Sequence, residues 1–152
     1  MLLALDGISE EDALKRIEGK TNHIIWMVGN FLDMRFALGK VLGLEIENPH
    51  NDLFFQGKAL DEAFDYPKLN ELKESFHHIS PLVYQKLLEI SDEELDKAFP
   101  MGMNIEFFPE NTLNFVGMCI GREDYLCGQI GLMRKILGYE AMKYDFNDAM
   151  KY

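Results

Sequence analysis

The stretch GREDYLCGQIGLMRKILG, residues 121–138, decides the fold that we expect for this chain. Its apolar residues recur at steps of three and four, which predicts an amphipathic helix. Arg122 falls on the same stripe as Leu126, Ile130 and Met133, where the helix should face a core. A buried arginine without a partner is strongly unfavourable, so its guanidinium must reach solvent or pair with a carboxylate. This charged residue on a core-facing stripe is the main question that the sequence raises.

The same periodicity predicts further helices upstream of this stretch. One long helix spans residues 22–42, and another begins at Pro67, because proline is tolerated in the first helical turn. The last long helix should span residues 112–137, with a glycine as its stop signal. Caps followed by acidic residues predict two short helices at residues 9–19 and 91–98.

Three long amphipathic helices, little strand signal and two long crossovers predict an all-α bundle in a single domain, residues 1–152. We expect the crossover at residues 45–66 to pack on itself or on the bundle, because it contains Phe54, Phe55 and Phe64.

The N-terminus is too short for a full-length first helix, because little sequence precedes Ser9. The fourth wall of the bundle must then come from the short N-terminal helix, from the tail after Gly138 or from a partner subunit. An exposed apolar stripe of that size usually marks an interface, so we expect a homodimer.

Composition disfavours several classes of partner. The formal net charge is −11, from 15 basic and 26 acidic residues, and it repels phosphate backbones and anionic membrane surfaces. No apolar run approaches the ~20 residues that a membrane span requires. Cys119 and Cys127 lie about 12 Å apart along a helix axis, which is too far for a disulfide. We therefore expect a cytoplasmic protein without nucleic-acid or membrane partners.

Asn30 is a second polar residue on an expected core stripe. Either its amide hydrogen-bonds a neighbouring helix, because an unpaired buried amide costs about 1–3 kcal/mol, or it faces a ligand cavity between helices. For Arg122 the acidic candidates are Asp33, Asp124 and the long crossover.

Glu123 and Cys127, with Cys119 one turn earlier, form an i, i+4 series on the last helix. Sulfur and carboxylate groups at that spacing are able to bind a metal. The alternative is that the cysteines are small buried hydrophobic residues, which is their commoner role. The four histidines form no recognisable ligand spacing, and His77 and His78 are adjacent, so they point about 100° apart on a helix.

Three segments, read in order, resemble the DinB-like (DinB/YfiT) proteins. NHIIWMVGNFLDMRFALGKVLG, residues 22–43, resembles their second helix, where a Trp-x-x-Gly-His motif stands. DEAFDYPKLNELKESFHHI, residues 61–79, resembles their third helix, which opens with Tyr-Pro. REDYLCGQIGLMRKILG, residues 122–138, resembles their fourth helix, with its His-x-x-x-His-x-Gly-Gln-Ile signature. The likeness extends over about residues 4–138.

The resemblance implies a four-helix bundle, here with a short or incomplete first helix, that is often dimeric and holds a divalent metal through three histidines. In this chain Asn30, Arg122 and Leu126 stand at the three ligand positions. Arginine does not ligate as a cation and leucine has no donor, so a metal site of the family type is not expected. The resemblance also implies why a charged residue lies on a core-facing stripe. Arg122 and Leu126 would lie on the stripe that lines the family's metal pocket.

Two main functions follow from these expectations. The first is a metal-free protein that binds a small molecule in a residual pocket around Asn30, Arg122 and Leu126, with Asp33, Glu123 and Cys127 as neighbours; an anion would suit the arginine. A dimeric interaction protein without a ligand belongs to the same metal-free class. The second is a metal-dependent thiol S-transferase or hydrolase of the DinB-like kind that uses other ligands, such as Glu123 and Cys127.

Overall fold

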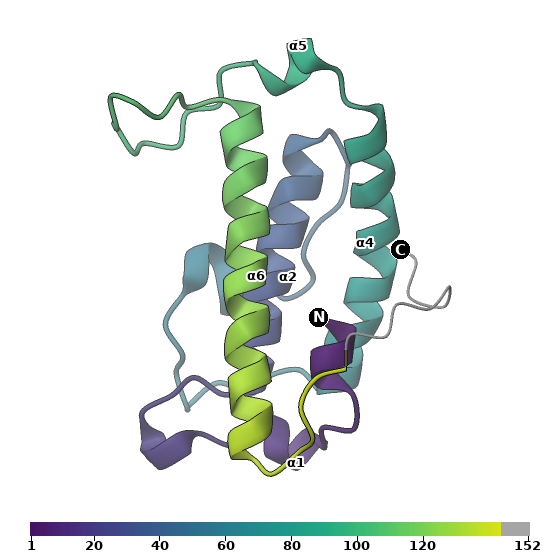
Figure 1. The fold of residues 1–152 in the computed structure, drawn as a ribbon, viewed down its shortest axis with the longest axis vertical. Coiled ribbons are helices and arrows are strands. Elements are labelled where there is room, and N and C mark those ends of the chain that lie inside the picture. The colour runs from purple at the N-terminus through teal and green to yellow at the C-terminus, as the bar shows by residue number, and fades with distance from the viewer. Residues whose placement is uncertain (144–152) are drawn as a thin grey trace.

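The computed structural model describes residues 1–143, and in this part of the chain it is all-α, as predicted (Figure 1). The three long helices are α2 (Ile24–Val41), α4 (Leu69–Glu89) and α6 (Thr112–Ile136). The short elements are α1 (Glu10–Ala13), α3 (Asn51–Phe54), α5 (Asp92–Leu95) and the 3-10 turns η1 (Leu2–Leu5), η2 (Ile17–Gly19) and η3 (Phe55–Gly57). An isolated bridge between Ala98 and Asn111 is the only β-pairing within residues 1–143.

Helix α2 is the central element, because it packs against both α4 and α6. Its apolar residues are buried on nearly every side, which is typical of a helix with neighbours all round. Residues 1–143 contain no fourth long helix, and the tail that we named as one source of a fourth wall lies, from residue 144 onward, outside the described residues.

The N-terminal segment supplies part of the missing wall. Turn η1 packs on α6 with Ala4 and Leu5 fully buried, and Arg134 of α6 donates hydrogen bonds to the carbonyls of Ala4 (3.3 Å) and Asp6. The predicted helix over residues 9–19 was wrong. Only the single turn α1 forms, because the backbone is extended at Arg16 before it enters η2.

Helix boundaries also differ from the prediction, and α2, for example, begins at Ile24 rather than at residue 22. Helix α4 begins at Leu69 rather than Pro67, and the carboxylate of Glu10 accepts hydrogen bonds from the backbone N–H groups of Leu69 (2.7 Å) and Asn70 (3.1 Å). A carboxylate at a helix N-terminus is favourable, because it satisfies free donors and opposes the helix dipole. Helix α5 ends at Leu95, three residues before the predicted end.

The crossover between α2 and α4 is fastened to α2. The ring of Phe54 is buried over Gly29, where an added Cβ atom would lie only 2.1 Å from the ring. The indole N–H of Trp26 donates to the carbonyl of Lys58 at 2.9 Å. Phe55 and Phe64 were expected to pack as well, but both are exposed. Glycine at position 29 therefore lets one aromatic ring dock the crossover beside Asn30.

Candidate functional site between α2 and α6

Arg122 and Asn30 form a direct contact between α6 and α2. The guanidinium donates from Nε (3.2 Å) and Nη2 (2.8 Å) to the amide oxygen Oδ1 of Asn30, whose side chain is buried. The guanidinium carbon lies 5.3 Å from the centre of the Tyr125 ring, a cation–π distance. Arg122 itself is half-buried, and no carboxylate pairs with it within residues 1–143. Of the partners considered for Arg122, the structure places Asn30 there rather than Asp33 or Asp124.

Leu126 lies one turn after Arg122 and is fully buried. On the opposite side, the crossover covers Asn30, since a Cβ atom at Gly57 would lie 3.5 Å from its Nδ2 atom. These three positions do not fit a divalent metal. Their one oxygen donor, Oδ1 of Asn30, already faces a cation, and the other two side chains offer no lone pair to a metal.

Glu123 forms a buried ion pair that the sequence analysis did not identify. Its carboxylate accepts hydrogen bonds from Nε (2.6 Å) and Nη2 of Arg35 on α2, in a bidentate arrangement. The Arg35 guanidinium also lies 5.4 Å from the Phe31 ring and 5.5 Å from the Phe76 ring. Glu123 thus lies on the buried stripe of α6, and the half-buried Arg122 lies beside it. The sequence did offer one indication of this pair, because Arg35 and Glu123 carry opposite charges on two helices that were expected to pack together.

The two cysteines do not join Glu123 in a ligand set. Cys119 is fully buried, and burial, with a smaller contribution from the charge of Glu123, raises the pKa of its thiol to about 12. Cys127 is half-buried, and both thiols are free. In the part of the chain that the structure describes, no three His, Cys, Asp or Glu side chains converge closely enough to hold a metal ion.

Asp33 lies one turn after Asn30 on α2 and lines an open groove of about 620 Å³. Its Oδ2 atom accepts a hydrogen bond from the backbone N–H of Gln56 (3.1 Å), and Oδ1 accepts one from Nδ2 of Asn48 (3.3 Å). Burial raises the pKa of the carboxyl above its usual range, against the effect of both hydrogen bonds. The other walls come from α2, the crossover and Phe115 of α6. The groove therefore begins about one turn along α2 from Asn30, and neither Asn30 nor Arg122 is part of its lining.

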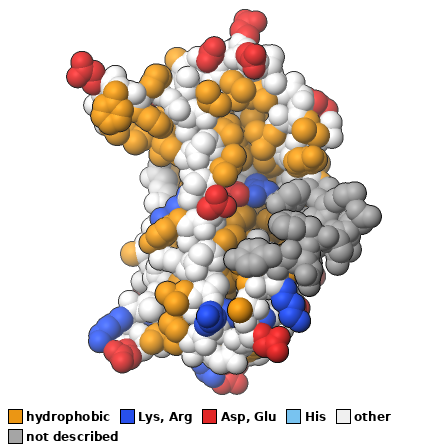
Figure 2. All heavy atoms as spheres, viewed as in Figure 1, with side chains coloured by type: hydrophobic (Ala, Val, Ile, Leu, Met, Phe, Trp, Pro, Cys, Tyr) orange, Lys and Arg blue, Asp and Glu red, His pale blue; other side chains and the backbone are white. Residues whose placement is uncertain are grey.

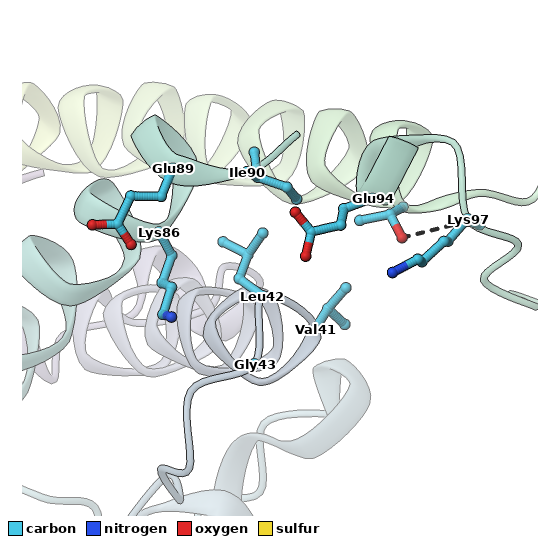
Figure 3. A pocket seen from close by; sticks show the side chains of 9 residues that line it. Val41, Leu42, Gly43, Lys86, Glu89, Ile90, Glu94 and Lys97 are labelled. Atoms are coloured by element: carbon cyan, nitrogen blue, oxygen red, sulfur yellow. Dashed lines mark hydrogen bonds between the residues drawn. The ribbon is translucent and has the colours of Figure 1, made fainter. Parts of the chain in front are cut away.

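A second cavity of about 370 Å³ lies where α2 and α4 end and α6 begins (Figure 3). Lys86, Glu89, Glu94 and Lys97 surround the apolar side chain of Leu42, and the hydroxyl of Thr112 donates to the carbonyl of Lys97 (3.4 Å). None of the residues that the sequence indicated as functional lines this cavity.

No family model matches the chain, and no curated protein or solved structure is significantly similar to it. Within residues 1–143, none of the helices combines the length and the apolar character needed to cross a membrane. Any assignment of function therefore depends on the site geometry and on the resemblance of its motifs.

Proposed function

We propose that this chain is a metal-free binding protein, a divergent DinB-like bundle in which Arg122 and Leu126 occupy the space of a metal site. The contact between Arg122 and Asn30 carries this proposal. The guanidinium brings a positive charge to the position where a family member would hold a metal cation, and the Asn30 oxygen accepts two hydrogen bonds from it. The buried side chain of Leu126 fills the remaining volume.

The ligand would bind in the groove that Asp33 lines, since this groove begins about one turn along α2 from Asn30 and is open to solvent. Its volume is within the range of small-molecule sites, which is roughly 300–1,000 Å³. Asp33 belongs to the set that the sequence indicated, and the crossover, which is fastened over Gly29, supplies the opposite wall. A rigidly held loop over a helical scaffold is a common way to build such a site.

The second candidate function is a metal-dependent thiol S-transferase or hydrolase that uses Glu123 and Cys127 as ligands. The geometry supports it less well. Glu123 is engaged by Arg35 in a bidentate ion pair, so a metal would have to displace a guanidinium from a buried carboxylate. The neighbouring thiol of Cys119 has a raised pKa, which opposes the thiolate form that ligates metals.

The test is metal analysis of the purified protein together with a variant in which Asn30, Arg122 and Leu126 are all replaced by histidine. We expect no stoichiometric zinc, nickel or manganese in the wild-type protein and a gain of zinc or nickel affinity in the triple variant. A wild-type protein that retains one metal per chain, and loses it on Glu123→Gln substitution, would establish the second candidate instead.

We also propose a homodimer. Helix α6 exposes Leu113 and Ile120 on one flank of its core stripe and Leu132 on the far side. Figure 2 shows hydrophobic side chains along α6 and on the loop before it. On the same helix Gly117 and Gly121 have open space where a Cβ atom would stand, so another helix backbone is able to approach closely. A long helix that is apolar on both sides is normally covered on both sides.

A further inference from the structure

We infer that the groove beside Asp33 binds a small molecule that carries a protonated amine next to an apolar group. This inference rests on the proposed function, because it assigns a ligand class to the groove named there. It depends on three observations: a buried carboxylate without a cation, apolar walls on both sides of it, and the balance of charge around the groove.

Asp33 is buried, with 7% of its surface exposed, and it lines the groove. Its two hydrogen bonds come from neutral groups, the amide of Asn48 and the backbone N–H of Gln56. No lysine, arginine or histidine forms an ion pair with it within residues 1–143. A carboxylate has about four lone-pair sites, so roughly two remain for further donors.

A purely structural role explains only part of this arrangement. Asp33 does fasten the crossover, because Asn48 donates to Oδ1 and the backbone N–H of Gln56 donates to Oδ2, but these two neutral donors leave its buried charge without a cation. The carboxyl instead bears a desolvation cost that its neighbours do not fully offset. A ligand ammonium group would provide the missing opposite charge and up to three N–H donors.

The rest of the lining suits an apolar group attached to that ammonium. Ala37 and Met34 of α2 form one side, and Phe115 of α6 and Phe55 of the crossover contribute aromatic rings. Phe55 is 54% exposed, although we expected it to pack in the core. An exposed ring at the edge of a groove supplies contact area to a ligand with little loss of side-chain freedom.

The charges around the groove favour a cation over an anion. Glu47, Asp52 and Asp33 contribute three carboxylates, and Lys40 contributes the one ammonium group of the lining. Arg122, which would suit an anion, is not part of this lining and directs Nε and Nη2 at Asn30. An anionic ligand would therefore meet more repulsion than attraction in this groove.

The experiment compares three probes that share a phenylethyl body: 2-phenylethylamine, 2-phenylethanol and phenylacetate. Each is titrated at millimolar concentration into the full-length protein, and binding is followed through amide chemical shifts in a two-dimensional NMR spectrum. We expect the amine to shift the amides of residues 33–40 and 46–56, with affinity at least about tenfold above that of the alcohol. This comparison uses the wild-type protein and needs no variant to fold.

Single substitutions test whether Asp33 is the carboxylate that binds the amine. Asp33→Asn should reduce the affinity for the amine to that of the alcohol, whereas Glu45→Gln, at an exposed carboxylate of the crossover outside the groove lining, should change it less than about twofold. Phe115→Leu should weaken all three probes by a similar factor, because it alters only an apolar wall.

The inference is overturned if the alcohol binds as tightly as the amine, if phenylacetate binds best, or if no probe shifts these amides. The first two results leave the proposed function intact, because they still place a ligand in the groove of a metal-free protein. Failure of the proposed function would be seen separately, in the metal content of the wild-type protein.

Discussion

Replacement of Glu123 by leucine tests the most consequential charge contact of the bundle. The side chains of Glu123 and Arg35 are 9% and 11% exposed, so neither charge has much access to water. Leucine removes the carboxylate and keeps much of its volume. Arg35 would then remain against the rings of Phe31 and Phe76 without an anion.

The magnitude follows from this burial. Removing one member of a buried ion pair typically costs about 3–5 kcal/mol, because the remaining charge stays desolvated. Domains of this kind are stable by only about 5–15 kcal/mol, so Glu123→Leu should remove a large part of the total. Arg35→Met should cost a similar amount. The double variant should regain most of the loss, since a buried pair can often be replaced by apolar residues at little net cost.

The assay is urea unfolding followed by far-ultraviolet circular dichroism, with all four proteins of the double-mutant cycle analysed at one pH. We expect a coupling energy of roughly 2–3 kcal/mol or more between Arg35 and Glu123. A loss below about 1 kcal/mol for Glu123→Leu, which is typical of a surface pair, would refute the burial argument. Strictly additive single effects would do the same.

Arg122→Met is the matched comparison at the other polar contact between α6 and α2. Its partner is the neutral amide of Asn30 and it is half-buried, so we expect a loss of about 1.5–3 kcal/mol, the contribution of a hydrogen bond to a charged group. This is less than the ion-pair value that a carboxylate partner would have implied. An Arg122→Met loss larger than that of Glu123→Leu would reverse our ranking of the two contacts.

Three further predictions concern the scaffold. Gly29→Ala, which would stabilise an ordinary helix, should here cost about 1–3 kcal/mol, because its Cβ atom meets the Phe54 ring. Urea unfolding of Gly29→Ala with and without Phe54→Leu measures how much of this cost the smaller side chain removes. His23 caps α2 through Nδ1, and burial lowers its pKa to about 4, so protonation favours the unfolded chain and stability should fall as the pH drops from about 6.5 to 4. In pH-dependent unfolding, His23→Asn should keep the cap and lack this contribution. Ile120→Glu should convert the dimer to a monomer in light scattering, and a wild-type protein that is already monomeric at micromolar concentration would contradict the homodimer.

The helical class and the long helices were predictable because their apolar periodicity reflects burial directly. Helix α6 was expected at residues 112–137 and is observed at Thr112–Ile136. The N-terminal segment was less predictable, since its conformation depends on partners distant in sequence. Arg134 binds the carbonyls of Ala4 and Asp6, and no local pattern in the first turns indicates that contact.

In the candidate site, too, the direction of a side chain was predictable from helical spacing, whereas a partner on another helix was not. Position along the helix was enough to predict that Arg122 would turn toward the bundle, because spacing along a helix fixes the direction of a side chain. Its partner was not predictable in this way, since the candidates were acidic and the structure has the amide of Asn30. The role of Glu123 was not predictable in this way. Spacing along one helix placed it beside Cys127, whereas its partner Arg35 comes from another helix.

Asp33 and Arg122 carry opposite charges, and no ion pair joins them within residues 1–143. Asp33 lies three residues after Asn30 on α2, the residue that accepts the Arg122 guanidinium. Instead, Asn48 and Gln56 of the crossover hold the carboxylate on the groove side of α2, while Asn30 and Tyr125 hold the guanidinium on the α6 side. In the binding site that we propose, the crossover would thereby hold a buried carboxylate without a cation at the wall of the groove, where the ammonium group of a ligand would pair with it.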